Sequence, residues 1–489
     1  MSRVARRAAS WGSCCLALAL SSCSGGEKRP PVVVIGVDGL EWSVAEALLK
    51  EVPSKMPNLQ RLLDEGVGGA LQTMVPTWSP VLWTTIATGR PPDAHGIYFF
   101  SEWDLEKNQP VPGGLPYTSD CRKVPAIWNL ADDAGKSVNS VAWWVSWPAE
   151  HLRHGRIVSS YAAQSQGALL WKAGVWKDGL PQLTWPASLA NDVAPFLRDG
   201  GPDGPAAVAQ VQRYGLCPRS WEEPDVLNEN GTVKVPGEKV VTRETNYRMS
   251  WISDRTHASI FNELLHQEVA DLNLVYFGCT DVAGHYFWKY QEPAAYSYPI
   301  DPQQVEFFGE HLRKTYTDVD TWLGEILAAM PAERVVMLVA DHGMQAYFKN
   351  NPKKFQNGGH QLGEPGVFIL SGTGVIRRGL LAKETRRLGN IMDVAPMICD
   401  LLGIPALVQM PGHSLRSFMT EEWQASHAEP ARQSSPLYRR AAGKPTEPID
   451  HANELFMEQL KALGYIDSNG GVDGLPDPAP PPTPEPQPR

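Results

Sequence analysis

Apolar residues gather in four short runs that are continuous rather than alternating. The runs are PVVVIGVDG (31–39), LNLVYFGCTD (272–281), RVVMLVADHG (334–343) and GVFILSG (366–372). A continuous apolar run of this length is typical of a strand that is buried on both faces, as in a parallel sheet covered by helices. We therefore predict that these runs are strands of one sheet. SVNSVAWWV (137–145) is a further strand candidate.

Helical periodicity occurs between and after these runs. Before the third run, one face of a predicted helix carries Phe308, Leu312, Tyr316, Val319, Leu323, Ile326 and Leu327. Residues 390–405, NIMDVAPMICDLLGIP, predict another helix, which Gly403 and Pro405 end. Strands that alternate with helices indicate an α/β fold. We expect a three-layer sandwich around a central, mostly parallel sheet.

Composition changes along the 489 residues and suggests how the chain is organised. Residues from about 100 to 265 are rich in Trp, Gly and Pro, and we expect them to form an insertion or cap on a catalytic domain of residues 31–440. Residues 447–466 predict a C-terminal helix. The proline-rich tail, 467–489, cannot bury apolar surface and is expected to be disordered.

The first residues have the pattern of an export signal. Basic MSRVARRAAS precedes WGSCCLALAL, which is apolar but too short to span a bilayer. Leu20–Cys23 then resembles the lipobox of bacterial lipoproteins, in which the cysteine is acylated. We expect a lipoprotein signal peptide over 1–23, a tether over 24–30, and an exported protein whose lipid at Cys23 contacts the membrane of the bacterial envelope. The alternative is a plain secretory signal cut nearby.

The net charge limits the kinds of binding partner, and the positions of the cysteines limit the disulfides that can form. The formal net charge is −10, so we expect no nucleic acid binding. A small anionic substrate stays possible because bound cations can invert the local field. Cys121 and Cys217 could form a disulfide in an oxidising compartment, whereas Cys279 and Cys399 lie in apolar runs and are expected to be buried free thiols.

Acidic residues follow three of the four predicted strands, and histidines lie close to them in the sequence. Ligands of open α/β sheets bind outside the carboxyl ends of the strands, so these side chains should converge. Carboxylates and imidazoles are suitable ligands for Zn²⁺ or Mn²⁺. The number of candidate ligands is larger than one tetrahedral site can use, so we predict two divalent metal ions. The expected ligands are Asp38, Asp281, His285, Asp341, His342 and His360.

The segment PTWSPVLWTTIATGRPPDAHGI (76–97) offers a nucleophile. Ser79 fits a helix N-cap with Pro80 at the first helical position, and Gly89 ends the helix. The positive end of the helix dipole favours an alkoxide and a bound anion there. Ser79 could be only a cap, but an adjacent dication would lower its pKa and favour it as the nucleophile. Four threonines of the segment are poorer candidates for the nucleophile, because they lie inside the predicted helix or before it: Thr77, Thr84, Thr85 and Thr88.

These motifs, in their order, resemble the alkaline phosphatase superfamily, and most closely its type I phosphodiesterase/nucleotide pyrophosphatase branch. The matching blocks, spread over residues 31–415, are VIGVDGLEW, SPVLWTTIATGRPPDAHGI, TDVAGHYFW, VADHGM, GGHQLGEPGVFILSGTGV and IMDVAPMICDLLGIP. The resemblance implies an alkaline phosphatase-like fold and a serine nucleophile. It also implies one ion held by Asp38, Asp341, His342 and Ser79, and another held by Asp281, His285 and His360.

Three positions refine the resemblance. Trp83 stands where sulfatases have an arginine, and Pro80 is misplaced for the sulfatase motif, so we expect no sulfatase chemistry. Phe100 occupies the position of an asparagine that binds phosphate oxygen in nucleotide pyrophosphatases, which leaves the choice between monoesters and diesters open. His95 matches a family position and is interpreted as a structural, hydrogen-bonded residue.

The predicted function is metal-dependent hydrolysis of a small phosphate ester through a phosphoserine at Ser79. A phosphomonoesterase or a phospho-group transferase of the same superfamily is the nearest alternative. A surface-anchored binding protein that has lost catalysis is another, but the presence of every expected ligand and of a hydroxyl argues against it.

Overall fold

The structure is a computed structural model that describes residues 29–434, except for 113, 164–181, 202, 224–225, 229–232, 236, 238–239 and 352–356. The expected signal peptide, Cys23, nearly all of the tether, the C-terminal helix and the proline-rich tail therefore lie outside the described residues. Within the described part, helices of sufficient length and apolarity to cross a membrane are absent.

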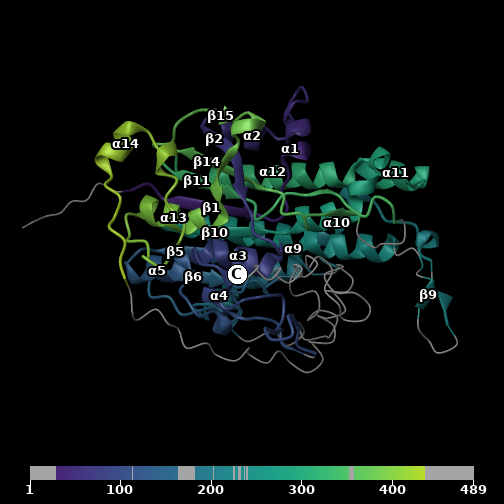
Figure 1. Cartoon of the computed structure of the whole chain (residues 1–489), viewed down its shortest axis with the longest axis horizontal. Helices are drawn as coiled ribbons and strands as arrows, with labels where there is room; N and C mark the ends of the chain where they lie inside the picture. Colours follow the sequence, from purple (N-terminus) through teal and green to yellow (C-terminus); the bar gives the residue numbers. More distant parts are fainter. Residues whose placement is uncertain are drawn as a thin grey trace, which may run out of the picture.

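A single large sheet forms the centre of the molecule (Figure 1). In spatial order its strands are β15 (Gly379–Leu380), β2 (Gly66–Gln72), β14 (Gly366–Gly372), β11 (Val335–Val339), β1 (Val32–Val37), β10 (Leu272–Phe277), β5 (Val138–Val141), β6 (Gly155–Val158) and β7 (Thr184–Trp185), and β16 (Arg387–Asn390) also pairs with β2. Short two-stranded pairs lie outside it: β3 (Trp103–Asp104) with β4 (Gln109–Pro110), β8 (Val226–Leu227) with β9 (Val233–Val235), and β12 (Gln345–Ala346) with β13 (Gly358–Gly359).

The centre of the sheet is parallel, as the continuous apolar runs predict. β1 pairs in parallel with both β10 and β11, so that Val34 lies opposite Leu274 on one side and Met337 on the other. Every residue of these three strands is buried, because helices cover both faces. The pairs β11–β14, β14–β2 and β6–β7 are antiparallel. The predicted α/β fold with a mostly parallel sheet is confirmed.

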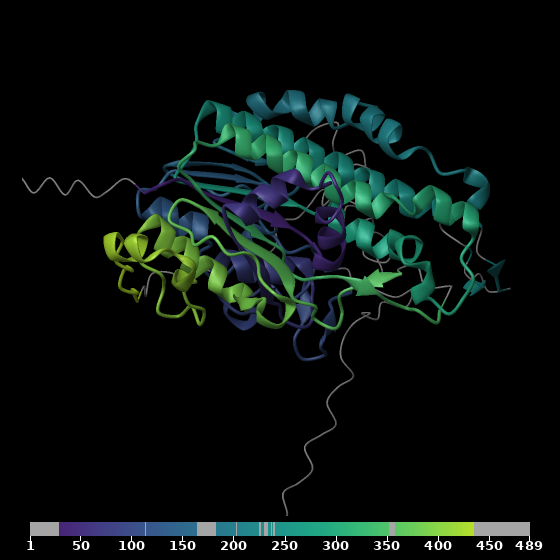
Figure 2. The same ribbon diagram turned by 90° about the horizontal axis from the view of Figure 1, so that it is seen from above.

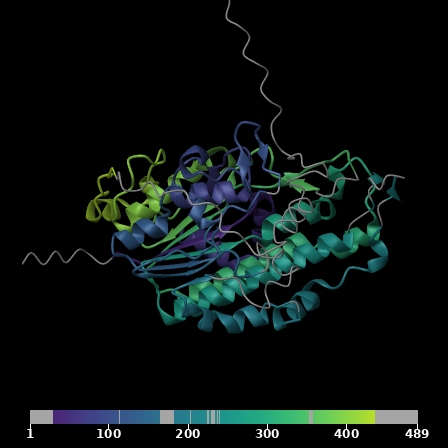
Figure 3. The ribbon, with the colours of Figure 1, turned by 90° about the horizontal axis from the view of Figure 1, so that it is seen from below.

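Helices form a layer on each face of this sheet (Figures 2 and 3). On one face α9 (Val240–Gln267), α10 (Cys279–Gln291) and α12 (His311–Ala329) pack against one another, and α12 also packs against α2 (Pro57–Asp64). On the other face α13 (Val394–Leu402) packs against α3 (Ser79–Thr88) and α5 (Ile127–Asp133). Among the described residues the remaining α-helices are α1 (Trp42–Leu49), α4 (Pro92–His95), α7 (Leu189–Asp199), α8 (Pro205–Tyr214), α11 (Pro302–Phe308) and α14 (Glu421–Ser426).

Residues 100–265 differ from the expected insertion or cap. β5, β6 and β7 extend the central sheet, and α9 packs on β10 and β5. β5 lies within the strand candidate 137–145, although the buried polar residues Asn139 and Ser140 interrupt its apolar pattern. The side-chain amide of Asn139 donates to that of Asn273 in the neighbouring strand β10. The strand candidate 137–145 is also shorter than expected, since regular pairing ends at Val141.

β2 shows another reason why a strand escapes sequence patterns. Its sequence, GVGGALQ, contains three glycines, yet it pairs with β14 over most of its length. A Cβ on Gly66 would lie 2.1 Å from the carbonyl oxygen of Leu370, and one on Gly69 would lie 2.4 Å from that of Arg386. The glycines are needed for this close approach of backbones, although glycine is otherwise unfavourable in strands.

The four cysteines that the structure describes show no cross-link. Cys121, Cys217, Cys279 and Cys399 are all buried free thiols. The suggested disulfide between Cys121 and Cys217 is therefore absent, while the expectation for Cys279 and Cys399 is met. Cys279 is the first residue of α10 rather than part of a strand.

Candidate active site

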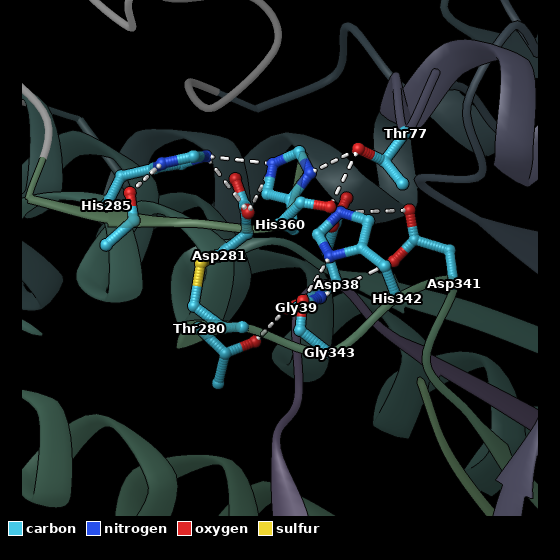
Figure 4. A network of polar contacts seen from close by, with 12 residues as sticks. Asp38, Gly39, Thr77, Thr280, Asp281, His285, Asp341, His342, Gly343 and His360 are labelled. Carbon is cyan, nitrogen blue, oxygen red and sulfur yellow. Dashed lines mark hydrogen bonds and ion pairs between the residues drawn. The ribbon is translucent and has the colours of Figure 1, made fainter. Parts of the chain in front are cut away.

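The carboxyl ends of the central strands carry three buried aspartates (Figure 4). Asp38 directly follows β1, and Asp341 lies two residues after the end of β11. Asp281 is the third residue of α10, which begins two residues after β10. Because β1 lies between β10 and β11, these three strand ends bring the carboxylates to one point of the sheet edge. These residues are at most 5% exposed.

Asp38, Asp341 and His342, here called the strand-end group, converge on one imidazole nitrogen. Nε2 of His342 lies 3.3 Å from Oδ1 of Asp38 and 3.5 Å from Oδ2 of Asp341. Nδ1 of His342 is 3.0 Å from the carbonyl oxygen of Gly343 and donates to it, so Nε2 is the nitrogen whose lone pair would bind a cation once its proton is displaced. Among the described residues, Nε2 and these two carboxylate oxygens have no hydrogen-bond partner.

Asp281, His285 and His360, the helix–loop group, show the same orientation. Oδ1 of Asp281 lies 3.3 Å from Nε2 of His285 and 3.6 Å from Nε2 of His360. Nδ1 of His285 donates to the carbonyl oxygen of Gly358 at 3.0 Å, and Nδ1 of His360 donates to Oγ1 of Thr77 at 2.7 Å. With both Nδ1 atoms as donors, the two Nε2 atoms, 3.1 Å apart, would face each other as acceptors. A cation between them would relieve this repulsion.

The two groups fit a pair of divalent cations. The ligand atoms of Asp38, Asp341 and His342 all lie within 4.8 Å of one another, and so do those of Asp281, His342 and His360. The rings of His342 and His360 stack with centroids 3.8 Å apart, so the groups adjoin. His342 thus belongs to both close sets, whereas the family resemblance pairs His285 with Asp281 and His360. Buried carboxylate oxygens and imidazole nitrogens in this arrangement are the donor set that Zn²⁺ or Mn²⁺ binds.

Electrostatics at the site reflect an excess of negative charge. Burial, and then the nearby charge of Asp38, raise the pKa of Asp341 well above its usual value. Burial opposes the charged form of His342, but Asp341 and Asp38 raise its pKa to about 10. Burial, together with the neighbouring imidazoles of His342 and His285, holds the pKa of His360 well below the usual value. Bound dications would offset the carboxylate charge.

Ser79 is the first residue of α3 and is 3% exposed. The expected cap lies one residue earlier, because Trp78 has the extended backbone of an N-cap and Pro80 takes the second helical position, where its missing N–H is equally harmless. Gly89 ends the helix in the left-handed conformation, as predicted. The flanking Thr77 contacts His360 and Trp83 contacts Asp38, so the start of α3 lies against both groups.

The other threonines of the segment have structural hydrogen bonds. Thr84 donates to the carbonyl oxygen of Pro80, and Thr88 donates to that of Thr84, one turn earlier in α3. Thr85 lies 3.0 Å from Nε2 of His95. Nδ1 of His95 accepts from the backbone N–H of Ile97, and burial followed by the charge of Arg122 lowers the pKa of His95 to about 3. His95 is a neutral, hydrogen-bonded residue, as interpreted from the sequence.

Three residues that support the ligands were missed by sequence reasoning. Oγ1 of Thr77 accepts from Nδ1 of His360 and donates to the carbonyl oxygen of the same residue. Nε1 of Trp83 and the hydroxyl of Tyr276 both donate to Oδ2 of Asp38. Nothing in the strand or helix patterns signals these contacts, since each joins segments far apart in the chain. Phe100 is buried and packs its ring against Phe99 and Trp144.

Solved structures of several phosphoester hydrolases and sulfatases are similar to this chain at low identity. Murine ectonucleotide pyrophosphatase/phosphodiesterase 5, an inactive form in complex with AMP, is 13% identical, with 80% of this chain and 100% of that chain covered and a TM-score of 0.45. The alkaline phosphatase PafA is 14% identical, with 80% and 99% covered and a TM-score of 0.49. Phosphonoacetate hydrolase from Sinorhizobium meliloti is 16% identical, with 65% and 57% covered and a TM-score of 0.37.

The family comparison covers more than half of the chain. The model of the type I phosphodiesterase / nucleotide pyrophosphatase family matches residues 32–362, from the first residue of β1 to just beyond His360. The match includes every expected metal ligand and Ser79. It confirms the prediction that the chain is an enzyme of the phosphoester hydrolase class. The chain belongs to the type I phosphodiesterase / nucleotide pyrophosphatase family.

Proposed function

We propose that this enzyme hydrolyses phosphate esters with Ser79 as the nucleophile and two divalent metal ions as cofactors, Zn²⁺ or Mn²⁺ by donor type. The observation that carries the proposal is the convergence of buried carboxylate oxygens and imidazole nitrogens at the start of α3. Asp38, Asp341 and His342 would hold one ion next to Ser79. Asp281, His285 and His360 would hold the other, with His342 stacked between the two groups.

Two such ions, when bound, neutralise charge on the phosphoryl oxygens and lower the pKa of a nearby hydroxyl or water. The chain itself supplies the alignment. Ser79 lies at the N-terminus of α3, where backbone N–H groups and the helix dipole favour an anionic phosphoryl group. In the first step Oγ of Ser79 gives up its proton and forms a bond to phosphorus. The bond from phosphorus to the ester oxygen breaks, and that oxygen takes up a proton and leaves as an alcohol.

In the second step water attacks the phosphoserine. One P–O bond forms to the water oxygen, the bond between Oγ of Ser79 and phosphorus breaks, and Ser79 regains a proton as the phosphate product leaves. The burial of both ligand groups limits water at the site, which strengthens electrostatic stabilisation of the phosphoryl charge.

A panel of synthetic esters tests this function. We expect purified enzyme to hydrolyse bis(p-nitrophenyl) phosphate, to lose turnover after chelation, and to regain it with Zn²⁺ or Mn²⁺. p-Nitrophenyl sulfate serves as the control that should remain uncleaved. No ester cleavage by protein that retains both metals would contradict the proposal and favour a binding protein.

A phosphomonoesterase or phosphotransferase activity is the second candidate function, and Phe100 is the residue that supports it. A nucleotide pyrophosphatase uses an asparagine at the corresponding position to hold a phosphate oxygen, whereas the buried ring of Phe100 offers no donor. Comparing p-nitrophenyl phosphate with the diester, with and without an added acceptor alcohol, separates the candidates. A phosphorylated acceptor would identify a transferase.

We also propose that the enzyme is exported and anchored by lipid at Cys23. The support is the basic, then apolar, then LSSC sequence that begins the chain. Expression in a bacterial host with fractionation and mass spectrometry tests it. We expect acylated Cys23 at the mature N-terminus in the membrane fraction, and release of a Cys23→Ala variant from that fraction. Soluble wild-type protein cut at another residue would show a plain secretory signal.

A further inference from the structure

We propose that Trp83 is a positioning residue that fixes the orientation of Asp38 and ties the Ser79 helix to this ligand. The inference deepens the proposed function and rests on it, because Asp38 must bind a cation for its orientation to matter. It assigns a role to a tryptophan at a position where the related sulfatase motif has an arginine.

The two oxygens of Asp38 have different environments. Oδ2 accepts from Nε1 of Trp83 at 2.9 Å and from the hydroxyl of Tyr276 at 2.7 Å. Oδ1 has no hydrogen-bond donor among the described residues and faces Nε2 of His342 at 3.3 Å. Rotation of the carboxylate would break both hydrogen bonds in a buried environment, where replacements from water are scarce. The two donors therefore keep Oδ1 directed at the strand-end group.

Trp83 can fix Asp38 because its own ring cannot move. The side chain is completely buried and makes edge-to-face contacts with Trp143 at 5.2 Å and Tyr276 at 5.1 Å between ring centroids. Its ring also lies on the backbone of β1, where a Cβ on Gly36 would be 2.6 Å from the indole. The carbonyl oxygen of Trp83 accepts from Nε1 of Trp143. The indole thus fills a closed space between α3 and β1.

Trp83 also lies on the same helix as the nucleophile. Ser79 and Trp83 are four residues apart in α3, so they lie on the same face, about 6 Å apart along the helix axis. One turn of helix and one indole therefore set the placement of Ser79 relative to Asp38. Because Ser79 and Trp83 belong to one helix, a shift of α3 would move both side chains together. The hydrogen bond from Nε1 of Trp83 then keeps Asp38 aligned with the hydroxyl of Ser79.

A purely structural role is the competing explanation, and Trp128 provides a matched control. Trp128 is also completely buried, and its Nε1 donates at 2.7 Å to the carboxylate of Glu150, which lies outside the site. Phenylalanine at either position removes one indole N–H from a buried carboxylate. Only the change at Trp83 should affect the metal site if Trp83 positions Asp38.

The experiment compares wild type, Trp83→Phe and Trp128→Phe as full chains. Chelator competition with Zn²⁺ measures the affinity for each of the two ions, and thermal unfolding of the metal-free proteins measures the structural effect. For Trp83→Phe we expect about 10- to 100-fold weaker binding of one ion, unchanged binding of the other, and a lower kcat at similar KM. For Trp128→Phe we expect a comparable drop in metal-free Tm with wild-type affinity for both ions.

Wild-type zinc affinity in Trp83→Phe, or equal weakening in Trp128→Phe, would overturn the inference. If Trp83→Phe does not fold, Gly36→Ala tests the same point, because the added Cβ would overlap the indole and displace it from its present position. The same loss of affinity for one ion is expected there, and wild-type affinity would again overturn the inference. Failure of the wild type to bind any metal would instead contradict the proposed function itself.

Discussion

The strand-end group and the helix–loop group contain the same types of ligand but are built differently. Asp38, Asp341 and His342 follow β1 and β11, which are hydrogen-bonded neighbours in the centre of the sheet. Asp281 and His285 lie on α10, and His360 lies on a segment after β13, which pairs only with the two-residue strand β12. The sheet therefore fixes the first group directly, whereas the second depends on contacts between a helix and a loop.

Those contacts are specific and buried. The side chain of Asn357 accepts from the backbone N–H of Lys289 at 2.8 Å and donates to the carbonyl oxygen of Tyr286 at 2.7 Å, which joins the loop to α10. Its backbone N–H donates to the carbonyl oxygen of His285. The comparison teaches that a metal centre can have one side defined by sheet topology and another by side-chain to backbone hydrogen bonds.

Replacement of Ser79 has the largest expected effect. Ser79→Ala removes the proposed nucleophile but no imidazole or carboxylate of either group, so we expect at least about a 10³-fold loss of kcat with two metal ions still bound. Turnover of the diester and metal analysis of the same sample measure both effects. Thr88→Ala, at the other end of α3, is the control and should keep near wild-type kcat. Activity close to wild type in Ser79→Ala would contradict the nucleophile assignment.

Removal of one ligand from each group comes next. We expect Asp341→Asn and His360→Gln each to lose one ion and about 10²- to 10³-fold in kcat/KM, with the larger loss for Asp341→Asn because the ion proposed there would lie beside Ser79. Metal analysis after dialysis and kinetics with added Zn²⁺ test this. A single variant that loses both ions would show that the groups bind their ions as one unit.

The variants Asp341→Asn and His360→Gln should also differ in the stability of the metal-free protein. Burial and the charge of Asp38 raise the pKa of Asp341, so the carboxylate is unfavourable in the fold without a cation. Asp341→Asn should therefore raise the metal-free Tm, whereas His360→Gln should lower it, because the hydrogen bond from Nδ1 to Thr77 is lost. Thermal unfolding in the presence of a chelator measures both changes in Tm. A change in the same direction in both variants would show that repulsion between the carboxylates does not destabilise the metal-free protein.

The strand-end group was the easier to predict from the sequence. PVVVIGVDG and RVVMLVADHG are continuous apolar runs that end in the ligands, so strand prediction and the rule for strand ends give both the fold and the site. The strand candidate 137–145 contains β5 but extends beyond it, whereas β2 was not predicted, since glycines interrupt its apolar pattern. The supports Thr77, Trp83 and Tyr276 depend on tertiary contacts that one sequence does not reveal.

A pH effect should arise at the start of α10, the helix that carries Asp281 and His285 of the helix–loop group. Asp254 is fully buried, and Oδ2 accepts from the backbone N–H groups of Gly278 and Cys279. Burial raises its pKa to about 7, so the folded protein retains a proton that the unfolded chain releases at lower pH. The free energy of unfolding should then fall by about 1.4 kcal/mol per pH unit as pH rises from about 4 to about 7.

Asp254→Asn should remove this slope, because the amide oxygen accepts the same hydrogen bonds without a charge. Relative to wild type, the variant should gain about 2 kcal/mol between pH 5.5 and pH 7. Urea unfolding of both metal-free proteins at the two pH values measures the difference. Parallel changes in the two proteins would show that Asp254 is ionised throughout or that another group dominates.

The smallest expected effect comes from Thr77, which supports His360 much as Trp83 supports Asp38. Thr77→Val keeps the volume but removes the hydroxyl that accepts from Nδ1 of His360 at 2.7 Å. We expect about 10-fold weaker binding of the helix–loop ion and little change at the other ion. Thr84→Val is the matched control, because the hydroxyl of Thr84 bonds only within α3.

The result also measures how independent the two groups are. The rings of His342 and His360 stack at an angle of 19°, so a shift of one ring can reach the other group. If Thr77→Val weakens only the helix–loop ion, the sheet holds the strand-end group regardless of the loop. If it weakens both ions equally, the stacked imidazoles couple them, and the contrast between a rigid and an adaptable side of the site is wrong.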